Sequence, residues 1–389
     1  MKPARIRLGM VGGGEGAFIG GVHRFAARLD AQYELVAGAL SSTADKALRS
    51  GQALGLAPER CYDSYESMAV AEAAREDGIE AVAIVTPNHL HAPVATAFLK
   101  AGIHVICDKP VTTHSADAKA LLALARKKNL VFAVTHNYSA YPMVRMARQM
   151  VQSGRLGELR VVQAEYPQDW LAEPLEQGGN KQAAWRTDPA QAGGGAIGDI
   201  GSHAWHLADY VTGEPLFQVC AELNSFVPGR AIDDNAQVML RYANGARGMI
   251  WASQVAPGHL NDLRLRVYGS KGGLSWSQEH PNQLRFTPLG QPTQILERAG
   301  PGFDAAGARL ARIPGGHPEG YLEAFASLYA EIAQHLRAAR GGGRKAVKAD
   351  KASHFPTIAD GLRGVQFIEA VQRSSRQGGR WIKLPAAAA

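Results

Sequence analysis

A glycine-rich loop near the amino terminus has the residue types and spacing of a phosphate-binding turn. It follows an apolar run over 6–11 and reads Gly12-Gly13-Gly14-Glu15-Gly16-Ala17-Phe18-Ile19-Gly20. Gly12 and Gly14 form a G-x-G pattern, in which the first glycine permits a tight turn and the second lets backbone approach a pyrophosphate. Amides at the start of the next helix favour the same negative charge. The loop predicts a dinucleotide site formed by Gly12, Gly13, Gly14, Ala17, Phe18 and Ile19, with Ala17 or Gly20 in place of the third glycine.

The end of the second expected strand leaves the choice of dinucleotide open. An acidic residue there would bind the ribose diol of NAD, but the chain reads Leu40-Ser41-Ser42-Thr43-Ala44-Asp45-Lys46. Ser41, Ser42 and Lys46 have the hydroxyls and the charge that a 2′-phosphate needs. Alternatively, Ser42 or Thr43 caps the next helix and Lys46 is solvated. We therefore expect NAD or NADP as cofactor, with Ser41, Ser42 and Lys46 among its ligands.

These loops need a parallel sheet to position them, and the first 137 residues have the matching pattern. Apolar runs typical of buried strands alternate with residues at helical spacing. The expected strands are 6–11, 33–40, 79–85, 103–107 and 130–134, and the expected helices are 19–29, 44–54, 91–100 and 115–128. Repeated strand–helix–strand units predict a doubly wound parallel sheet, so residues 1–137 are expected to form a Rossmann domain.

The pattern changes after Asn137, where short strands are joined by turns. The expected strands are 160–165, 218–226, 237–242, 246–254, 263–268 and 273–277, and amphipathic helices are expected over 321–337 and 358–373. Asn244-Gly245 and the glycines between Gly269 and Gly273 predict hairpin turns. Residues 138–389 are therefore expected to form an α+β domain with a large, mainly antiparallel sheet.

Composition restricts the class of protein and its compartment. The chain has 389 residues, 46% hydrophobic and 20% charged, which is typical of a globular protein of two domains. The net charge is +7, but the basic residues are scattered, and even the densest stretch, 337–351, lacks the pattern of a nucleic-acid site. Three distant cysteines indicate neither disulfides nor a metal site, and no run approaches the roughly 20 apolar residues of a membrane helix. We expect a soluble cytoplasmic protein.

Three further motifs occur in a fixed order. Thr86-Pro87-Asn88-His89-Leu90-His91 follows one buried strand, and Cys107-Asp108-Lys109-Pro110 ends the next. Gly193-Gly194-Gly195-Ala196-Ile197-Gly198-Asp199-Ile200-Gly201-Ser202-His203 comes later. Together they resemble the Gfo/Idh/MocA family of glucose-fructose oxidoreductase and inositol dehydrogenase. The resemblance covers nearly the whole chain, because residues 360–381 are similar to that family's closing helix and strand.

The resemblance implies hydride transfer between a nicotinamide and a secondary alcohol or ketone of a sugar, cyclitol or related polyol, without a metal. Lys109 matches the family's Glu-Lys-Pro lysine, with Asp108 in place of glutamate, and would hydrogen-bond the reacting hydroxyl. Asp199 and His203 match the Asp-x-Gly-x-His motif, which implies that His203 is the general acid–base and that Asp199 binds the substrate or orients the group beside it. They are four residues apart, so a helical turn would place both on one face. The family's sheet is open and commonly packs in dimers or tetramers.

Each of these three residues also has a structural interpretation. Lys109 is equally typical of a lysine at a strand end, Asp199 of a helix cap, and His203 of a buried helical histidine, with His206 as a competing base. Further ligands are expected around them. For the cofactor these are Thr86, Pro87, Asn88, His91, Asp108, Lys109 and Asn137, and for the substrate Tyr138, Asp169, Trp170, Trp185, Arg186, Asp199 and His203.

Two other functions are compatible with the resemblance. Some relatives use a retained NAD to oxidise a glycoside transiently, eliminate the aglycone and reduce the product again. A few others bind NADP and act as regulators without catalysis. The second alternative predicts damage at the catalytic positions, whereas Lys109, Asp199 and His203 are all present.

Overall fold

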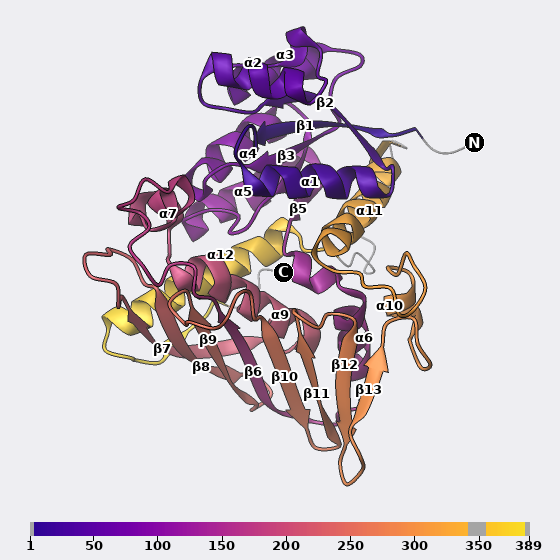
Figure 1. Ribbon diagram of the computed structural model, residues 1–389, viewed down its shortest axis with the longest axis vertical. Coiled ribbons are helices and arrows are strands. Elements are labelled where there is room, and N and C mark those ends of the chain that lie inside the picture. The colour runs from indigo at the N-terminus through magenta and orange to yellow at the C-terminus, as the bar shows by residue number, and fades with distance from the viewer. Residues whose placement is uncertain (1–3, 341–354, 386–389) are drawn as a thin grey trace. The chain divides into compact units, whose positions relative to one another are not determined.

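The computed structural model describes residues 4–340 and 355–385, which fold into two compact units (Figure 1). The first unit comprises Met1–Asn137 and Leu322–Leu362, and the second comprises Tyr138–Tyr321 and Arg363–Ala389. The sequence-based division at residue 137 assigned 322–362 to the second domain, whereas by their contacts the described residues 322–340 and 355–362 pack with the first unit. Residues 341–351 of the basic stretch lie outside the described residues.

A parallel sheet forms the centre of the first unit, as predicted. Its strand order is β2-β1-β3-β4-β5. The strands are β1 (Ile6–Gly12), β2 (Tyr33–Ala39), β3 (Ala81–Val85), β4 (His104–Cys107) and β5 (Phe132–Val134). All five residues of β3 are buried, which explains its uninterrupted apolar sequence. The chain leaves β1 and β3 in opposite directions, and such a switch point places ligands at the carboxyl ends of both strands.

The helices that connect these strands are mostly those that the spacing predicts. They are α1 (Phe18–Leu29), α2 (Ala44–Ala53), α3 (Tyr65–Ala74), α4 (His91–Lys100) and α5 (Ser115–Lys128), with short 3₁₀ turns η1 (Pro58–Arg60), η2 (Asn88–Leu90) and η3 (Asn137–Ala140). The helix α3 was not predicted. Its apolar residues are spread around the helix rather than gathered in a stripe, and the clearest local sign of it is its amino-terminal cap, Ser64, which accepts a hydrogen bond from the amide of Ser67.

A late helix, α11 (Tyr321–Arg340), completes the first unit. Tyr329 anchors it, because its backbone carbonyl accepts a 2.9 Å hydrogen bond from the Tyr33 hydroxyl and its own hydroxyl lies 2.9 Å from Nδ1 of His23. Arg337 also donates to the side chain of Gln32 at 2.6 Å. These contacts join residues about 300 positions apart, and no local pattern reveals them.

A nine-stranded sheet dominates the second unit, in the order β13-β12-β11-β10-β6-β9-β8-β7-β14. The strands are β6 (Leu159–Pro167), β7 (Leu216–Asn224), β8 (Asn235–Tyr242), β9 (Arg247–Ser253), β10 (Arg264–Gly269), β11 (Gly272–Ser277), β12 (Gln283–Pro288), β13 (Gln294–Glu297) and β14 (Ile382–Lys383). The sheet is mainly antiparallel, as predicted, with β6 and β9 as its parallel pair. The predicted turns join β8 to β9 and β10 to β11, whereas β12 and β13 were not predicted. The closing strand that the resemblance implied is β14, which begins just beyond residue 381.

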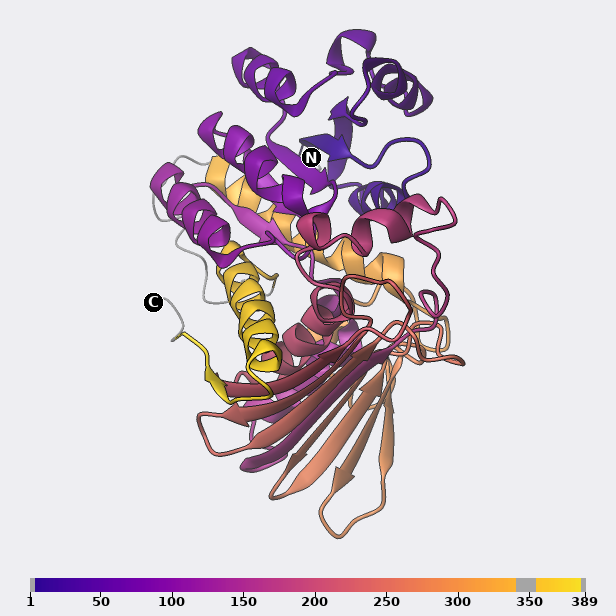
Figure 2. The ribbon, with the colours of Figure 1, turned by 90° about the vertical axis from the view of Figure 1, so that its left-hand side faces the viewer.

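In Figure 2 the long helices of the second unit lie over one face of this sheet, and among the described residues the other face is bare of helices. The long ones are α6 (Pro142–Gln152), α9 (Ser202–Thr212) and α12 (Ile358–Arg376), and the short ones are α7 (Lys181–Arg186), α8 (Pro189–Ala192) and α10 (Ala305–Ala308). A π-helical turn, η4 (Ile197–Gly201), runs directly into α9. Within the described ranges, no helix has both the length and the apolar character needed to cross a membrane.

Candidate active site

The glycine loop after β1 has the backbone that a dinucleotide requires. Gly12 and Gly13 have positive φ angles of 79° and 71°, where a side chain would be strained. A Cβ on Gly14 would lie 2.5 Å from the carbonyl oxygen of Leu40. The loop is therefore closely packed from behind and leads into the amino terminus of α1, which fits a bound pyrophosphate.

Gly20 occupies the position of the third glycine, where the helix packs against the loop. A Cβ at this position would lie 2.4 Å from the Cα of Gly13, so only glycine lets α1 approach the loop. Ala17 is the cap residue of α1, and its amide donates to the carbonyl of Gly14 at 3.0 Å. The loop is thus longer than the usual spacing, and the ambiguity between Ala17 and Gly20 is resolved in favour of Gly20.

The residues after β2 remain candidates for the ribose. Thr43 occupies the cap position of α2, but its side chain makes no capping hydrogen bond. Ser42 is exposed, while Ser41 and Lys46 are half-buried. The expectation that Ser42 or Thr43 caps the helix through its hydroxyl is therefore wrong for Thr43. The hydroxyls of Ser41 and Ser42 follow the carboxyl end of β2, where a ribose is expected.

His91 joins the two loops that follow β3 and β4. Its ring is fully buried, with Nδ1 2.8 Å from the carbonyl oxygen of Pro110 and Nε2 3.0 Å from that of Thr86. Burial lowers the pKa of this imidazole, and the nearby Asp108 carboxylate raises it to a smaller extent. Since both ring nitrogens face backbone carbonyls, the side chain of His91 holds the two loops together. It is therefore not available as the direct cofactor ligand that the sequence predicted.

Asp108 and Lys109 end β4 at the same edge of the sheet. Oδ1 of Asp108 accepts hydrogen bonds from the Lys109 amide at 2.9 Å and from the Thr135 hydroxyl at 2.8 Å, and so connects the ends of β4 and β5. Lys109 itself is half-buried. Polar atoms of Thr86 and Asn137 lie buried nearby in the loops after β3 and β5, and neither Thr86 Oγ1 nor Asn137 Nδ2 has a hydrogen-bond partner among the described residues.

In the second unit, the Asp-x-Gly-x-His motif occupies the π-helical turn η4 and the first turn of α9. Such π-helical turns are rare and are frequent at functional sites. Asp199 lies in the middle of η4, and His203 is the second residue of α9. The cap residue of α9 is Gly201, so the alternative that Asp199 caps this helix is wrong.

Two side chains hold the Asp199 carboxylate. Gln254, which follows β9, donates from Nε2 to Oδ2 of Asp199 at 3.0 Å. Nε of Arg186 lies 3.5 Å from the same oxygen, and the guanidinium stacks on Trp185 at 4.2 Å and lies 6.0 Å from the ring centre of Trp170. Four of the predicted substrate residues therefore gather in one cluster, and Gln254 joins them although no sequence signal marked it.

Aromatic rings surround His203, whose side chain is nearly buried. The ring of Tyr138 lies edge-on to the imidazole at 4.8 Å, and that of Tyr166 is 6.2 Å away. The two phenol oxygens are 2.6 Å apart, and Tyr166 donates to Oδ1 of Asn261 at 2.6 Å. Burial raises the pKa of Tyr138, hydrogen bonds with Tyr166 and Asn261 oppose this shift, and the Asp199 carboxylate adds a smaller increase.

Two other predicted positions fall outside this cluster. Asp169 bonds the backbone amide of Gly258 at 3.4 Å. His206 is buried, and its burial together with Arg363, Arg148 and Arg145 lowers its pKa to about 3. An imidazole with so low a pKa is a much weaker base than an ordinary histidine, which argues against His206 as the proton acceptor. Among the described residues, no group of three His, Cys, Asp or Glu side chains is placed to hold a metal ion.

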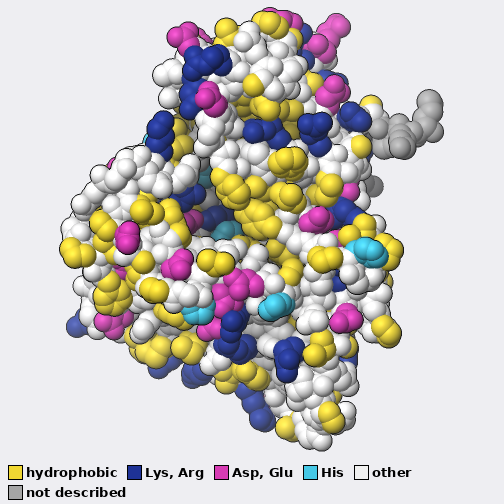
Figure 3. Space-filling view, in the orientation of Figure 1, with side chains coloured by type: hydrophobic (Ala, Val, Ile, Leu, Met, Phe, Trp, Pro, Cys, Tyr) yellow, Lys and Arg dark blue, Asp and Glu magenta, His cyan; other side chains and the backbone are white. Residues whose placement is uncertain are grey.

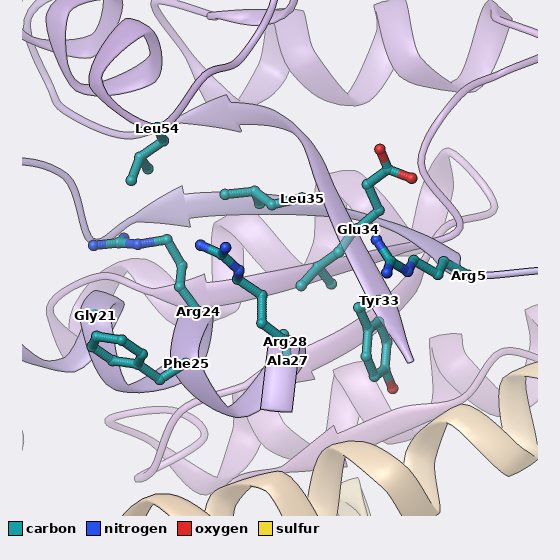
Figure 4. Close-up of a pocket in the computed structure, with 11 residues that line it drawn as sticks. Arg5, Gly21, Arg24, Phe25, Ala27, Arg28, Tyr33, Glu34, Leu35 and Leu54 are labelled. Carbon is teal, nitrogen blue, oxygen red and sulfur yellow. The ribbon is translucent and has the colours of Figure 1, made fainter. Parts of the chain in front are cut away.

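A cavity of about 440 Å³ lies elsewhere in the first unit, between α1 and β2 (Figure 4). Arg5, Arg24 and Arg28 line it together with Phe25, and hydrophobic side chains gather over α1 on the surface in Figure 3. None of the predicted site residues lines this cavity. It is therefore separate from the candidate site, although Arg24 also donates to the carbonyl of Gly13 at 2.6 Å.

Known proteins share this arrangement over the whole chain. Residues 6–136 match the model of an oxidoreductase family with an NAD-binding Rossmann fold, and residues 144–275 match the Gfo/Idh/MocA C-terminal domain. The chain is 35% identical to the uncharacterized oxidoreductase YfiI of Bacillus subtilis, over 97% of both proteins.

Solved structures are similar as well. An oxidoreductase from Sinorhizobium meliloti superposes with a TM-score of 0.88 at 53% identity, covering 98% of this chain and 100% of that one. An inositol dehydrogenase homologue from Azotobacter vinelandii, complexed with NADH and myo-inositol, has a TM-score of 0.91 at 36% identity over 97% of both chains. The chain therefore belongs to the Gfo/Idh/MocA family of oxidoreductases, and its first unit is an NAD-binding Rossmann domain.

Proposed function

We propose that this protein is a dehydrogenase that interconverts a secondary alcohol and a ketone on a cyclitol, sugar or related polyol. The observation that carries the proposal is the cluster at the start of α9, where Asp199 is held by Gln254 and Arg186 beside His203. A fixed carboxylate, a guanidinium and flat indole faces suit the hydroxyls and C–H surfaces of a polyol. The similarity to the inositol dehydrogenase homologue supports a cyclitol as the first substrate to test.

The proposed division of labour follows from the chemistry of each side chain. NAD, when bound, supplies the hydride acceptor or donor at its nicotinamide ring. Lys109 donates a hydrogen bond to the reacting oxygen and stabilises its developing negative charge. His203 takes the hydroxyl proton during oxidation and returns it during reduction. Asp199 binds a neighbouring hydroxyl and so fixes which carbon reacts.

NAD is the cofactor that we propose, because the solved relatives that resemble this chain contain it. Ser41, Ser42 and Lys46 would then bind the ribose hydroxyls, although the same groups suit a 2′-phosphate. The comparison of kcat/KM with NAD and with NADP decides between the two, and an advantage of NADP would overturn this part of the proposal.

The test is a panel of inositols, sugars and glycosides assayed with both cofactors for the formation of reduced nicotinamide. We expect turnover on at least one polyol and a loss of roughly a hundredfold or more in kcat for Lys109→Ala, because one positioned donor contributes that much to such reactions. Affinity for NADH should remain within a few-fold. Unchanged turnover in Lys109→Ala would exclude the mechanism. Product release from a glycoside without net NADH would instead favour the transient-oxidation alternative.

We also propose that the bare face of the sheet joins two or four copies of the chain. Exposed apolar side chains pair across its strands, Met239 with Met249 and Val161 with Tyr268. These four residues are between 38% and 52% exposed, which is unusual for such a set on one sheet. A second copy would cover them and bury the apolar surface.

A further inference from the structure

We propose that Asp233 is a positioning residue that fixes the segment carrying Asp199 and His203. Asp233 precedes β8 and belongs to none of the motifs in the sequence. It lies 34 residues beyond Asp199 in the chain but contacts the start of the same segment. The proposal rests on the function proposed above, since it assigns Asp233 a part in placing the groups that perform the reaction.

Three consecutive amides bind Asp233. Its Oδ1 accepts from the Gly195 amide at 3.0 Å and its Oδ2 from the Ile197 amide at 2.8 Å. Its backbone carbonyl accepts from the intervening Ala196 amide at 2.8 Å. These are the amides that open the π-helical turn η4, and the start of a helix leaves such donors without partners inside the helix. A carboxylate there satisfies them and interacts favourably with the helix dipole.

Glycine just before η4 permits this close contact. A Cβ on Gly195 would lie 1.8 Å from the carbonyl oxygen of Asp233, so any side chain would force the segment away from β8. A Cβ on Gly194 would come within 3.2 Å of the Cα of Gly198. Glycine at position 195 is therefore explained by the close approach of Asp233, whereas Gly194 packs against Gly198.

A second tie runs from the same edge of the sheet to Asp199. Gln254 donates to the Asp199 carboxylate, and its backbone amide donates to the carbonyl of Asp234 at 2.8 Å. The start of β8 thus fixes both the first amides of η4 and the orientation of the carboxylate in its middle. Loosening the Asp233 contact would let η4 and the first turn of α9 shift, and small displacements of reacting groups have large effects on rate.

Asp234, the next residue before β8, provides a matched control. It is fully buried, and its carboxylate accepts from the amides of Phe226 and Val227 at 3.0 and 3.1 Å and from Arg230 at 3.2 Å. Like Asp233 it binds two backbone amides, but those amides belong to a different loop. Asp234→Asn alters only the side chain and keeps the backbone carbonyl that accepts from the Gln254 amide. This replacement should therefore cost stability without moving Asp199 or His203.

The experiment compares Asp233→Asn with Asp234→Asn in the full chain, using NAD and myo-inositol, or the best polyol of the panel. In Asp233→Asn an amide nitrogen would face a backbone N–H, so we expect kcat to fall by about tenfold or more while the KM for NAD changes less than about twofold. Hydrogen exchange should quicken at residues 195–199. Asp234→Asn should speed exchange at 226–227 and keep kcat within about threefold.

Several outcomes would overturn the proposal. These are an unchanged kcat in Asp233→Asn despite faster exchange, an equal loss of kcat in Asp234→Asn, or an Asp233→Asn variant that loses stability but no activity. If Asp233→Asn does not fold, hydrogen exchange in the wild-type protein still tests whether Asp233 holds this segment. Rapid exchange of the Gly195 and Ile197 amides would contradict that contact. A wild-type protein without activity on any polyol would overturn the proposed function instead, and this result is distinct from the others.

Discussion

The side-chain amide of Gln254 and the carboxylate of Asp199 form a 3.0 Å hydrogen bond in the second unit. Gln254 is only 2% exposed and is itself held through its backbone, so it orients the carboxylate firmly. The contact joins the end of β9 to the π-helical turn before α9. It makes Gln254 a positioning residue for the proposed substrate ligand.

Replacing Gln254 should therefore weaken the reaction with the polyol. Gln254→Leu removes the donor at similar volume, and a hydrogen bond to a charged group contributes about 1.5 to 3 kcal/mol. We expect kcat/KM for the polyol to fall by about ten- to a hundredfold and the KM for NAD to stay constant. Steady-state kinetics measures both, with Gln291→Leu in the exposed turn between β12 and β13 as the control. A Gln254→Leu enzyme as efficient as the wild type would show that Asp199 needs no such support.

The contact between Gly20 and Gly13 predicts the behaviour of two neighbouring alanine variants. Gly20→Ala places a methyl group 2.4 Å from the Cα of Gly13 and should displace the loop, raising the Kd for NADH by tenfold or more, as expected when backbone must move away from a phosphate. Gly21→Ala has no neighbour nearer than 4.0 Å and should bind NADH like the wild type. Fluorescence titration with NADH distinguishes them. Equal affinities would mean that Gly20 has no part in shaping the loop.

Buried histidines predict a loss of stability in acid. Burial lowers the pKa of His23 and of His104 to about 4 and, with three arginines nearby, that of His206 to about 3. In the unfolded chain each would titrate near about 6.5. As pH falls from about 6.5 towards 4, the unfolded state binds protons that the folded state cannot, so the free energy of unfolding decreases. Above about pH 7 these groups contribute no pH dependence.

Thermal unfolding between about pH 7 and 4.5 tests this expectation. The Tm should decrease steadily below about pH 6, and His23→Gln should flatten the slope. That comparison is made at equal ionic strength, because the variant also loses the contact between His23 and Tyr329. A wild-type Tm that is constant or rises on acidification would show that these imidazoles are already charged in the folded protein.

The apolar pair across β8 and β9 predicts an effect of charge on assembly. Met239 and Met249 lie opposite each other and are 52% and 47% exposed, so Met249→Lys would place an ammonium group in the proposed interface. We expect light scattering to give a dimer or tetramer for the wild type and a smaller species for Met249→Lys. Val70→Lys, on the surface of the first unit, is the control. A monomeric wild-type protein would contradict the proposed interface.

Local patterns in the sequence were sufficient to predict the parallel sheet of the first unit and four of the helices that connect its strands. The strands of the parallel sheet are buried on both faces, so their apolar runs stand out, and Gly12 and Gly14 follow the first of them. The spacing of Asp199 and His203 also placed both at the start of one helix. These features depend on residues within a few positions of each other.

The rest depends on contacts between distant residues. Gln254 and Asp233 reach Asp199 and its segment only because β8 and β9 pair in a particular register, and that register is not written in either strand. The helix α11 joins the first unit through Tyr329 and Arg337, about 300 residues from their partners. His91 matched a ligand pattern, but its burial between two loop carbonyls appears only in the folded chain.

The most direct test is a crystal structure of the protein with NADH and myo-inositol, or the best polyol of the panel. We predict one polyol oxygen within hydrogen-bond distance of both Nζ of Lys109 and the imidazole of His203, with the Asp199 carboxylate on a neighbouring hydroxyl. A polyol bound with Lys109 and His203 contacting different parts of it, or neither, would contradict the proposed reaction.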